Sequence, residues 1–418
     1  MAAAGQCVQL QPMVIMDKSR ITDILLWLCD QGLTGLKEPE LLAGFCEKCT
    51  EIGLPVARAM VLIDTLHPEF EGRVFRWDKV EEFNPIVEYG SSSEGEAQRN
   101  WQDSVFYHLL EVGADEMRIP LATDDLPPFN MIPALKEQGH VDFIAMVHRF
   151  TERGRVGEMD CVYSSWSTRS QDGFSDSDLA VLRLLMPTLA LAIKSASCVR
   201  IIETLAEVYL GQDAGEQVIG GRIARGAAER IEAVIWFSDL YNYTSIAERA
   251  RPEDIIPFLN DYAETVITAI EECGGSVLKL IGDGVLAIFT AEQRELACAA
   301  ALDAEKLLRQ RLVEQNRQRE MEGGPVTDVY LGLHIGEVFY GNIGSRSRLD
   351  FTVVGPAVNE ATRISALCRS VDRTLILSSE FVGACPQDRQ RDLVSLGRFA
   401  LKGVSRAKEL FTLDRERP

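Results

Sequence analysis

The sequence predicts a mixed α/β protein of the α+β type, with two domains joined by a helical linker. The first part of the chain mixes helix and strand patterns, and the second alternates apolar strands with long amphipathic helices. Glycines at positions 211, 215, 220, 221 and 226 separate the two parts. The 418 residues suffice for two or three domains with their own cores. We expect a tail over 1–16, a first domain over 17–195, a helical, glycine-containing linker over 196–229 and a second domain over 230–418.

The composition excludes several classes of protein. The chain has 43 Lys and Arg residues and 63 Asp and Glu residues, which gives a formal net charge of -20. This charge opposes general attraction to nucleic acid or to an anionic membrane surface. No stretch approaches the roughly 20 apolar residues that span a bilayer, and the first residues lack the charged and apolar regions of an export signal. The ten cysteines show no disulfide-framework spacing. We therefore expect a cytoplasmic protein that binds neither nucleic acid nor membrane.

Two of these cysteines, Cys46 and Cys49, have the spacing of a metal or redox motif. No second pair of Cys or His lies nearby in the sequence to complete a metal site. The surrounding segment LLAGFCEKCTEIG favours two ordinary residues of a helix.

The first part of the chain predicts a series of short helices and strands. The spacing of apolar residues predicts a helix that ends near Gly32, one over 39–49 and one over 101–112. Strands are expected over 56–66, 117–121, 141–150 and 160–167, and a loop over 90–98. A long final helix follows, for which Ser175 or Asp176 is a suitable N-terminal cap.

This order of elements, closed by FSDSDL and a helix rich in alanine and leucine, resembles GAF-type sensor domains over roughly residues 17–195. The resemblance implies a GAF-like α/β sensor domain with room for a small-molecule ligand. Candidates to line such a pocket are His108, His148, Cys161, Trp101, Phe106, Phe143 and Trp166. Single His and Trp residues in apolar runs more often belong to a core, and that is the interpretation we favour.

The final helix has two interpretations. Its apolar residues follow three- and four-residue spacing from Leu182 to Val199, and the phase shifts by one from Ile202 to Tyr209. The pattern is typical of a short parallel coiled coil with a phase break. It is equally typical of one amphipathic helix packed on its own domain.

The second part of the chain alternates strands and helices. The apolar run IEAVIWFSDL predicts a strand that ends at an acid, and a helix is expected over 252–273. The runs SVLKLI and VLAIF predict two strands joined by the tight turn Gly282-Asp283-Gly284. A helix over 292–321, a strand, a bent hairpin region, a helix over 357–368 and the strand TLILSS complete the pattern.

Two acids stand at the edges of these apolar strands, Asp239 at a strand end and Asp283 at the apex of the turn. Such positions direct a carboxylate into a crevice rather than into a core. Two carboxylates that converge there are suitable ligands for hard divalent cations that serve phosphates. Each acid alone would be ordinary, because Asp is common in turns and helix caps, so the interpretation depends on the residues around them.

Five segments resemble those of class III nucleotidyl cyclases. In order along the chain they are FSDLYNYT, KLIGDGVLAIF, LGLHIGEVFYGNIGS, VVGPAVNEATRI and LKGVSRAKELFTL. They are similar to the family's two metal-binding strands, its central strand with the dimerisation arm, its transition-state helix and its C-terminal lysine strand. The resemblance covers about residues 230–415. It implies a ferredoxin-like catalytic domain with a mainly antiparallel central sheet.

The resemblance also implies a role for each matching residue. Asp239, Asp283 and the backbone carbonyl of Leu240 would hold two Mg²⁺ or Mn²⁺ ions per site. These ions would lower the pKa of the ribose 3′-hydroxyl and neutralise the triphosphate.

The remaining matches would act on the nucleotide itself. Asn359 would orient the ribose, and Arg363, one helical turn further on, would stabilise charge on the α-phosphate. Lys402, in the segment LKG, would be a further phosphate contact.

Two positions bear on the choice of base. Lys279 matches the family's adenine-reading lysine, and Thr352 stands where many adenylyl cyclases carry Asp, as in subclass IIIb. The resemblance therefore implies an adenylyl cyclase that converts ATP to cyclic AMP and pyrophosphate under control of the N-terminal domain. The alternatives are a guanylyl cyclase and a nucleotide-binding regulatory module without turnover.

The chain is expected to act as a homodimer. Lys279 and Asp283 flank one short turn, so a single copy can hardly supply both to the same site. The family resolves this with two head-to-tail domains. One chain supplies Asp239 and Asp283, and its twin supplies Lys279, Thr352, Asn359 and Arg363. A C2 dimer with two equivalent interfacial sites follows.

The loop after the first acid departs from the family pattern. Asn242 replaces a glycine that lets the backbone pass close to the triphosphate, and Pro356 replaces a frequent Asp or Asn. Asn tolerates left-handed backbone better than most residues do, so the loop is expected to persist. Pro356 suits the first turn of a helix.

Overall fold

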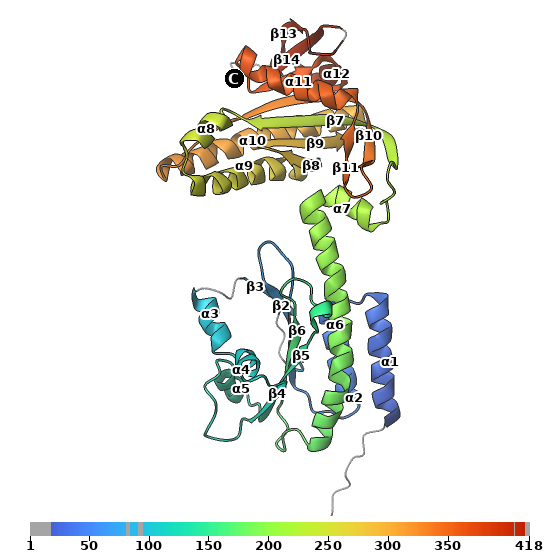
Figure 1. The fold of residues 1–418 in the computed structure, drawn as a ribbon, viewed down its shortest axis with the longest axis vertical. Helices are drawn as coiled ribbons and strands as arrows, with labels where there is room; N and C mark the ends of the chain where they lie inside the picture. Colours follow the sequence, from blue (N-terminus) through green and yellow to red (C-terminus); the bar gives the residue numbers. More distant parts are fainter. Residues whose placement is uncertain (1–17, 81–83, 91–94, 405, 414–418) are drawn as a thin grey trace, which may run out of the picture. The chain divides into compact units, whose positions relative to one another are not determined.

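The computed structural model of the chain describes residues 18–80, 84–90, 95–404 and 406–413 (Figure 1). The expected tail over 1–16 lies outside the described residues. The chain forms two compact units, Met1–Leu205 and Ala206–Pro418, each with its own sheet and core.

The sheet of the N-terminal unit is antiparallel, with the strand order β3-β2-β1-β6-β5-β4. Its strands are β1 (Arg58–Asp64), β2 (Gly72–Asp78), β3 (Ile86–Tyr89), β4 (Glu116–Pro120), β5 (Asp142–Arg149) and β6 (Cys161–Thr168). The four strands expected from the sequence are present. β2 and β3 were not expected, because both are short and their charged side chains interrupt the apolar pattern.

Helices cover both faces of this sheet (Figure 1). They are α1 (Lys18–Thr34), α2 (Glu38–Glu51), α3 (Gly95–Gln102), α4 (Val105–Val112), α5 (Ile132–Glu137) and α6 (Asp176–Leu210). Cys46 and Cys49 are fully buried in α2, which confirms them as core residues. Four of the candidate pocket residues, Phe106, Phe143, Cys161 and Trp166, are likewise buried in the cores.

Two details of this unit differ from the expectations. The single helix expected over 101–112 is wrong, because Ser104 caps a new helix there by accepting the backbone N–H of Tyr107 at 3.1 Å. The loop expected over 90–98 is also too long, since α3 begins at Gly95, and residues 91–94 lie outside the described part.

Helix α6 is one continuous helix from Asp176 to Leu210. Ser175 caps it, accepting the backbone N–H of Asp178 at 3.2 Å. Its first part packs on its own unit, whereas Val199 and Ile202 remain exposed. By length and apolar composition it could cross a bilayer, so the expectation of no such stretch was wrong for this helix. Half of its most apolar window is buried, as also happens in a core helix.

The C-terminal unit has a mainly antiparallel sheet with the order β13-β14-β12-β10-β7-β9-β8, and β11 pairs with β10 outside this path. Its strands are β7 (Ala228–Leu240), β8 (Ser276–Ile281), β9 (Gly284–Thr290), β10 (Val329–Gly344), β11 (Leu349–Val354), β12 (Leu375–Ser378), β13 (Leu393–Phe399) and β14 (Lys408–Leu413). The expected turn between β8 and β9 is confirmed, with Gly282 at a φ of 65°.

The helices of this unit lie on both faces of the sheet. They are α7 (Gln212–Ile219), α8 (Tyr243–Arg249), α9 (Pro252–Glu272), α10 (Arg294–Met321), α11 (Pro356–Val371), α12 (Ser379–Ala384) and α13 (Gln387–Gln390). α9 and α10 pack on the face that contains Val234 and Trp236, while α7 and α11 pack on the face that contains Ala233 and Ile235 (Figure 1). The alternation along β7 produces these two cores.

Helix α11 packs very closely on β10 at Gly332. A Cβ atom at this glycine would lie 2.6 Å from the Ser365 nitrogen and 2.7 Å from the Ala361 carbonyl oxygen. Any larger side chain would separate the helix from the strand. Gly332 therefore fixes the height of α11 above the sheet.

Candidate active site

The two predicted acids lie together. Asp239 is the last residue but one of β7, and Asp283 is at the apex of the β8–β9 turn. The Asp283 carboxylate accepts the backbone N–H of Leu240 at 3.3 Å. β9 can begin this close to β7 because Gly284 has no side chain: a Cβ there would lie 2.7 Å from the Ser238 carbonyl oxygen.

The acids open onto a cavity of about 170 Å³ between the strand ends and α9. Its lining is Ser238, Asp239, Leu240, Ile256, Leu259, Asn260, Tyr262, Ala263, Val266, Leu280, Gly282, Asp283, Val285 and Val329. Carboxylates and carbonyls supply its polar edge, and α9 supplies much of its apolar wall.

The Asp283 carboxyl affects the protonation of Asp239. Burial, followed by the neighbouring Asp283 carboxyl, raises the pKa of Asp239 from its ordinary value of 3.8 to about 6. A divalent cation would relieve this repulsion, and carboxylate oxygens are the donors that such cations prefer. The donor set therefore fits Mg²⁺ or Mn²⁺. Within the described ranges no group of three or more His, Cys, Asp or Glu residues could hold a metal ion, so further ligands would have to be backbone carbonyls, water or phosphate oxygens.

Replacing Asp239 with asparagine is expected to stabilise the metal-free protein at neutral pH. Because folding raises the pKa of this carboxyl to about 6, the ionised form opposes folding above that pH, and the cost disappears as the pH falls towards 4. The side chain is also partly exposed, so we expect about 1 kcal/mol after solvent screening.

Thermal unfolding in a chelator, at pH values from 4.5 to 7.5, measures this gain. The advantage of Asp239→Asn should grow as the pH rises through about 6. Mn²⁺ should stabilise the wild-type protein and reduce the difference. A gain of the same size at every pH would contradict the assignment.

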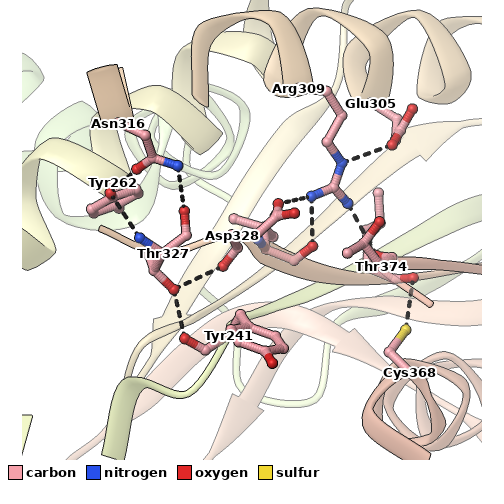
Figure 2. A network of polar contacts seen from close by, with 11 residues as sticks. Tyr241, Tyr262, Glu305, Arg309, Asn316, Thr327, Asp328, Cys368 and Thr374 are labelled. Carbon is pink, nitrogen blue, oxygen red and sulfur yellow. Dashed lines mark hydrogen bonds and ion pairs between the residues drawn. The ribbon is translucent and has the colours of Figure 1, made fainter. Parts of the chain in front are cut away.

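A network of polar contacts fixes the chain just after the first acid (Figure 2). The backbone N–H of Tyr241 donates to the Asp328 carbonyl at 2.8 Å, and the Tyr241 carbonyl accepts from the Thr327 hydroxyl at 2.6 Å. The Thr327 N–H donates to the Tyr262 hydroxyl at 3.1 Å, and Asn316 donates to the Thr327 carbonyl at 2.7 Å. α9 and α10 thus hold the backbone next to Leu240.

Arg309 of α10 completes this network (Figure 2). It donates to the carbonyls of Val329 and Thr374 at 2.7 and 3.0 Å and pairs with Glu305 and Asp328. The guanidinium therefore ties α10 to two strands of the sheet. A backbone carbonyl can serve as a metal ligand only where the chain is held in place, and this network holds the chain next to Leu240.

The loop after Asp239, in which the sequence departs from the family pattern, has a defined conformation. Asn242 adopts left-handed backbone, with φ 55° and ψ 24°, directly before α8. This confirms that asparagine accommodates the position where the family carries glycine. α8 was not expected from the sequence, since it has only seven residues.

The two base-reading candidates lie on β8 and β11, which contact one another although they do not pair in the sheet. Lys279 of β8 forms an ion pair with Asp350 of β11 at 3.0 Å. Thr352 lies two residues further along β11, on the same face as Asp350. Its hydroxyl is buried and has no hydrogen-bond partner among the residues that the structure describes. Asp350 thus links the Lys279 ammonium to the strand that carries the Thr352 hydroxyl. An ammonium group and a hydroxyl together suit a ligand with both acceptor and donor atoms.

The sequence did not point to Asp350. Asp350 is two residues before Thr352, and residues two apart in a strand point to the same face. This alternation was the signal that could have pointed to Asp350. Its pairing with Lys279 joins residues 71 positions apart, and such a contact is visible only in the fold. Arg369 was also missed; its charge acts to lower the pKa of Asp239.

The phosphate candidates gather around α11. Asn359 is exposed and Arg363 is half-buried, one turn apart on this helix. A Cβ atom at Gly403 would lie 3.4 Å from the Arg363 guanidinium, so Arg363 lies beside the turn that contains Lys402. Lys402 precedes β14 instead of lying on the strand. Lys408, on the strand, pairs with Glu360 at 3.1 Å.

One chain does not bring all these residues together. Asp283 turns towards Asp239 and the cavity beside α9, whereas Lys279 turns towards Asp350 on β11. The metal candidates and the base-reading candidates therefore form separate groups, although Lys279 and Asp283 belong to one hairpin.

Comparisons with known proteins show what the C-terminal unit resembles. Residues 227–414 match the family model "Adenylate and Guanylate cyclase catalytic domain". An adenylate cyclase of Anabaena cylindrica is 37% identical over 168 residues, which cover 39% of this chain and 33% of that protein. Adenylate cyclase 1 of Rhizobium meliloti is 29% identical over 200 residues, covering 46% and 28%. The chain thus spans about a third of the length of these curated relatives.

Among solved structures, the adenylyl cyclase CyaB from P. aeruginosa aligns with a TM-score of 0.41 and 22% identity, over 45% of this chain and 95% of that one. The family match covers nearly the whole C-terminal unit, including both acids, Lys279 and α11. Residues 227–414 are therefore similar to an adenylate and guanylate cyclase catalytic domain.

Proposed function

We propose that the protein is an adenylate cyclase that converts ATP to cyclic AMP and pyrophosphate. The observation that carries this proposal is the pair of carboxylates, Asp239 and Asp283, at the edge of a cyclase-domain sheet whose hairpin also carries Lys279. The names of the relatives in Anabaena and Rhizobium support the choice of adenylate cyclase.

The reaction joins the ribose 3′-oxygen to the α-phosphorus. The bond from this phosphorus to the pyrophosphate oxygen breaks, and the 3′-hydroxyl gives up its proton. Two Mg²⁺ or Mn²⁺ ions held by Asp239, Asp283 and the Leu240 carbonyl would lower the pKa of that hydroxyl and neutralise the triphosphate.

The side chains around α11 would act on charge and orientation. Arg363 is half-buried beside the turn of Lys402, so both cations can face a triphosphate from the same side. Arg363 would stabilise charge on the α-phosphate and Lys402 would bind a further phosphate oxygen. Asn359, exposed on the same helix, would hold the ribose by hydrogen bonds.

Lys279 and Thr352 would read the adenine. Adenine presents an acceptor at N1 and a donor in its exocyclic amine. The Lys279 ammonium can donate to the first, and the unpaired Thr352 hydroxyl can accept from the second. Lys279 would exchange its ion pair with Asp350 for this contact.

Each site would use two chains. Because Lys279 and Asp283 face different groups within one chain, a complete site needs Asp239 and Asp283 from one copy and the nucleotide-binding residues from another. A C2 homodimer supplies two equivalent sites in this way.

The N-terminal unit would regulate the enzyme. Its antiparallel sheet, covered by helices on both faces, supports the GAF-like sensor interpretation, with a small molecule as the input. We propose a cytoplasmic location for the whole protein, in line with its strong negative charge.

Product analysis with the full chain tests the proposal. With Mn²⁺ and ATP, cyclic AMP should form, and kcat/KM for ATP should exceed that for GTP. A preference for GTP would make the protein a guanylyl cyclase. Saturable ATP binding without cyclic product would make it a regulatory module. The replacement of the family's glycine by Asn242 is the feature that favours this alternative.

A further inference from the structure

Helix α7 lies against the strands that carry the base-reading residues. At Gly211, the residue before α7, a Cβ atom would lie 2.5 Å from the Val277 carbonyl oxygen of β8. Gly211 also has a φ of 82°, which side chains rarely permit. Val277 is two residues before Lys279, and the β8–β9 register shifts between these two residues. The start of α7 therefore touches the strand at its irregular point.

A partly buried hydrogen bond joins α7 to β10, the strand that pairs with β11. The Tyr340 hydroxyl, on β10, donates to the Asp213 carboxylate of α7. Tyr340 is only 5% exposed, and burial together with Asp213 raises its pKa. The Tyr340 ring packs edge-on against Phe351 at 4.9 Å, and Tyr340 pairs with Val353 across the two strands. Its two neighbours on β11 thus flank Thr352.

An apolar core continues this connection. Ala214 of α7 is buried in the same cluster as Leu278, Tyr340, Phe351 and Val353. Leu278 precedes Lys279 in the chain. Residues adjacent to both base-reading positions therefore share one core with α7.

The metal candidates lie further along the strands than the core of α7. The cavity of Asp239 and Asp283 is lined by α9, which packs on the face with Val234 and Trp236. The core of α7 includes Ala233 and Ile235 of β7. Asp239 points to the same face but lies four residues beyond Ile235, at the end of the strand.

Helix α7 is also fixed to the end of α6. A Cβ atom at Gly215 would lie 2.9 Å from the Ala206 carbonyl carbon and 3.0 Å from the Glu207 nitrogen. The two helices cross at backbone contact there, so a movement of the last turn of α6 moves α7 with it.

We propose that α7 positions Lys279 and Thr352, through the Gly211 contact and the Asp213–Tyr340 hydrogen bond, and so sets which purine the enzyme selects. Asp213 and Tyr340 are positioning residues in this scheme. A signal that arrives through α6 would change the affinity and choice of nucleotide and leave metal affinity unchanged. This inference rests on the proposed cyclase function.

The test compares Asp213→Ala, Tyr340→Phe and Gly211→Ala with wild type in the full chain. Each variant loses or distorts one α7 contact. We expect the ratio of kcat/KM for ATP to that for GTP to fall about fivefold or more, mainly through KM for ATP. The Mn²⁺ concentration for half-maximal activity should stay within about twofold of wild type, since α7 is remote from the acids.

Two further variants separate positioning from general damage. Asp213→Asn keeps an acceptor for the Tyr340 hydroxyl and should retain most of the selectivity. Glu216→Ala removes an exposed carboxylate from the same helix and should match wild type. If kcat falls for both nucleotides while the ATP-to-GTP ratio is unchanged, or if the Mn²⁺ requirement shifts as much as KM, the inference is wrong.

The proposed function can fail independently. If wild type forms no cyclic nucleotide, the cyclase assignment is lost. Competition of ATP and GTP against a fluorescent ATP analogue then measures the same selectivity in every variant. An unchanged ratio of the two affinities in Asp213→Ala and Tyr340→Phe would overturn the positioning role, and a reduced ratio would support it.

Discussion

Asp283→Ala is expected to lower cyclic AMP formation by the full chain at least about a thousandfold, with Mn²⁺ and ATP at saturation. The carboxylate faces Asp239 across the strand end and accepts the Leu240 N–H. Its removal leaves one of the two acids and frees the backbone beside the Leu240 carbonyl. Both effects act on the groups that would hold the ions.

The fold should survive this change. Asp283 lies in a turn at the sheet edge and is half-buried, so thermal unfolding should move by only a few degrees. Asp392→Ala, which removes an exposed carboxyl before β13, is the matched control and should keep full activity. If Asp283→Ala retained more than about a tenth of the wild-type rate, Asp283 would have no part in metal binding.

Mixing two inactive variants is expected to restore activity. Asp283→Ala and Lys279→Ala should each be nearly inactive as a homodimer. In a mixed dimer, one site receives both mutations, and the other receives an intact acid from one chain and an intact lysine from its partner. With random exchange at equal concentrations, about one quarter of the wild-type activity should return.

A second mixture of variants serves as the control for this experiment. Asp239→Ala and Asp283→Ala remove two acids that, in the proposed dimer, come from the same chain. Every site in their mixed dimer lacks one acid, so no activity should return. Recovery in this second mixture, or none in the first, would show that the site is not divided between chains as we propose.

The sequence predicted the regular parts of the C-terminal unit well. β7, α9 and the β8–β9 turn have strong local signals: a continuous apolar run, a clear helical period and a glycine on each side of Asp283. Such elements form where local preference and burial agree. The two acids could be located for the same reason, because each sits at the end of such an element.

The contacts that position the site could not be predicted in this way. α7 starts after Gly211 and contains Gly215, so its local pattern indicates a break in the helix. Tertiary packing on β8 and β10 makes it a helix nonetheless. The pairs Lys279–Asp350 and Asp213–Tyr340 join distant segments, and only the folded sheet brings them together.

The absence of a side chain at Gly332 restricts how the active site can open. With the Ser365 nitrogen and the Ala361 carbonyl directly above this glycine, α11 can neither tilt towards nor slide along β10 without steric overlap. Asn359 and Arg363 therefore travel with the sheet as one rigid body. In the proposed dimer, opening and closing around a nucleotide would then be a hinge-like displacement of one protomer against its twin, and hydrogen exchange in α11 should be slow in both states.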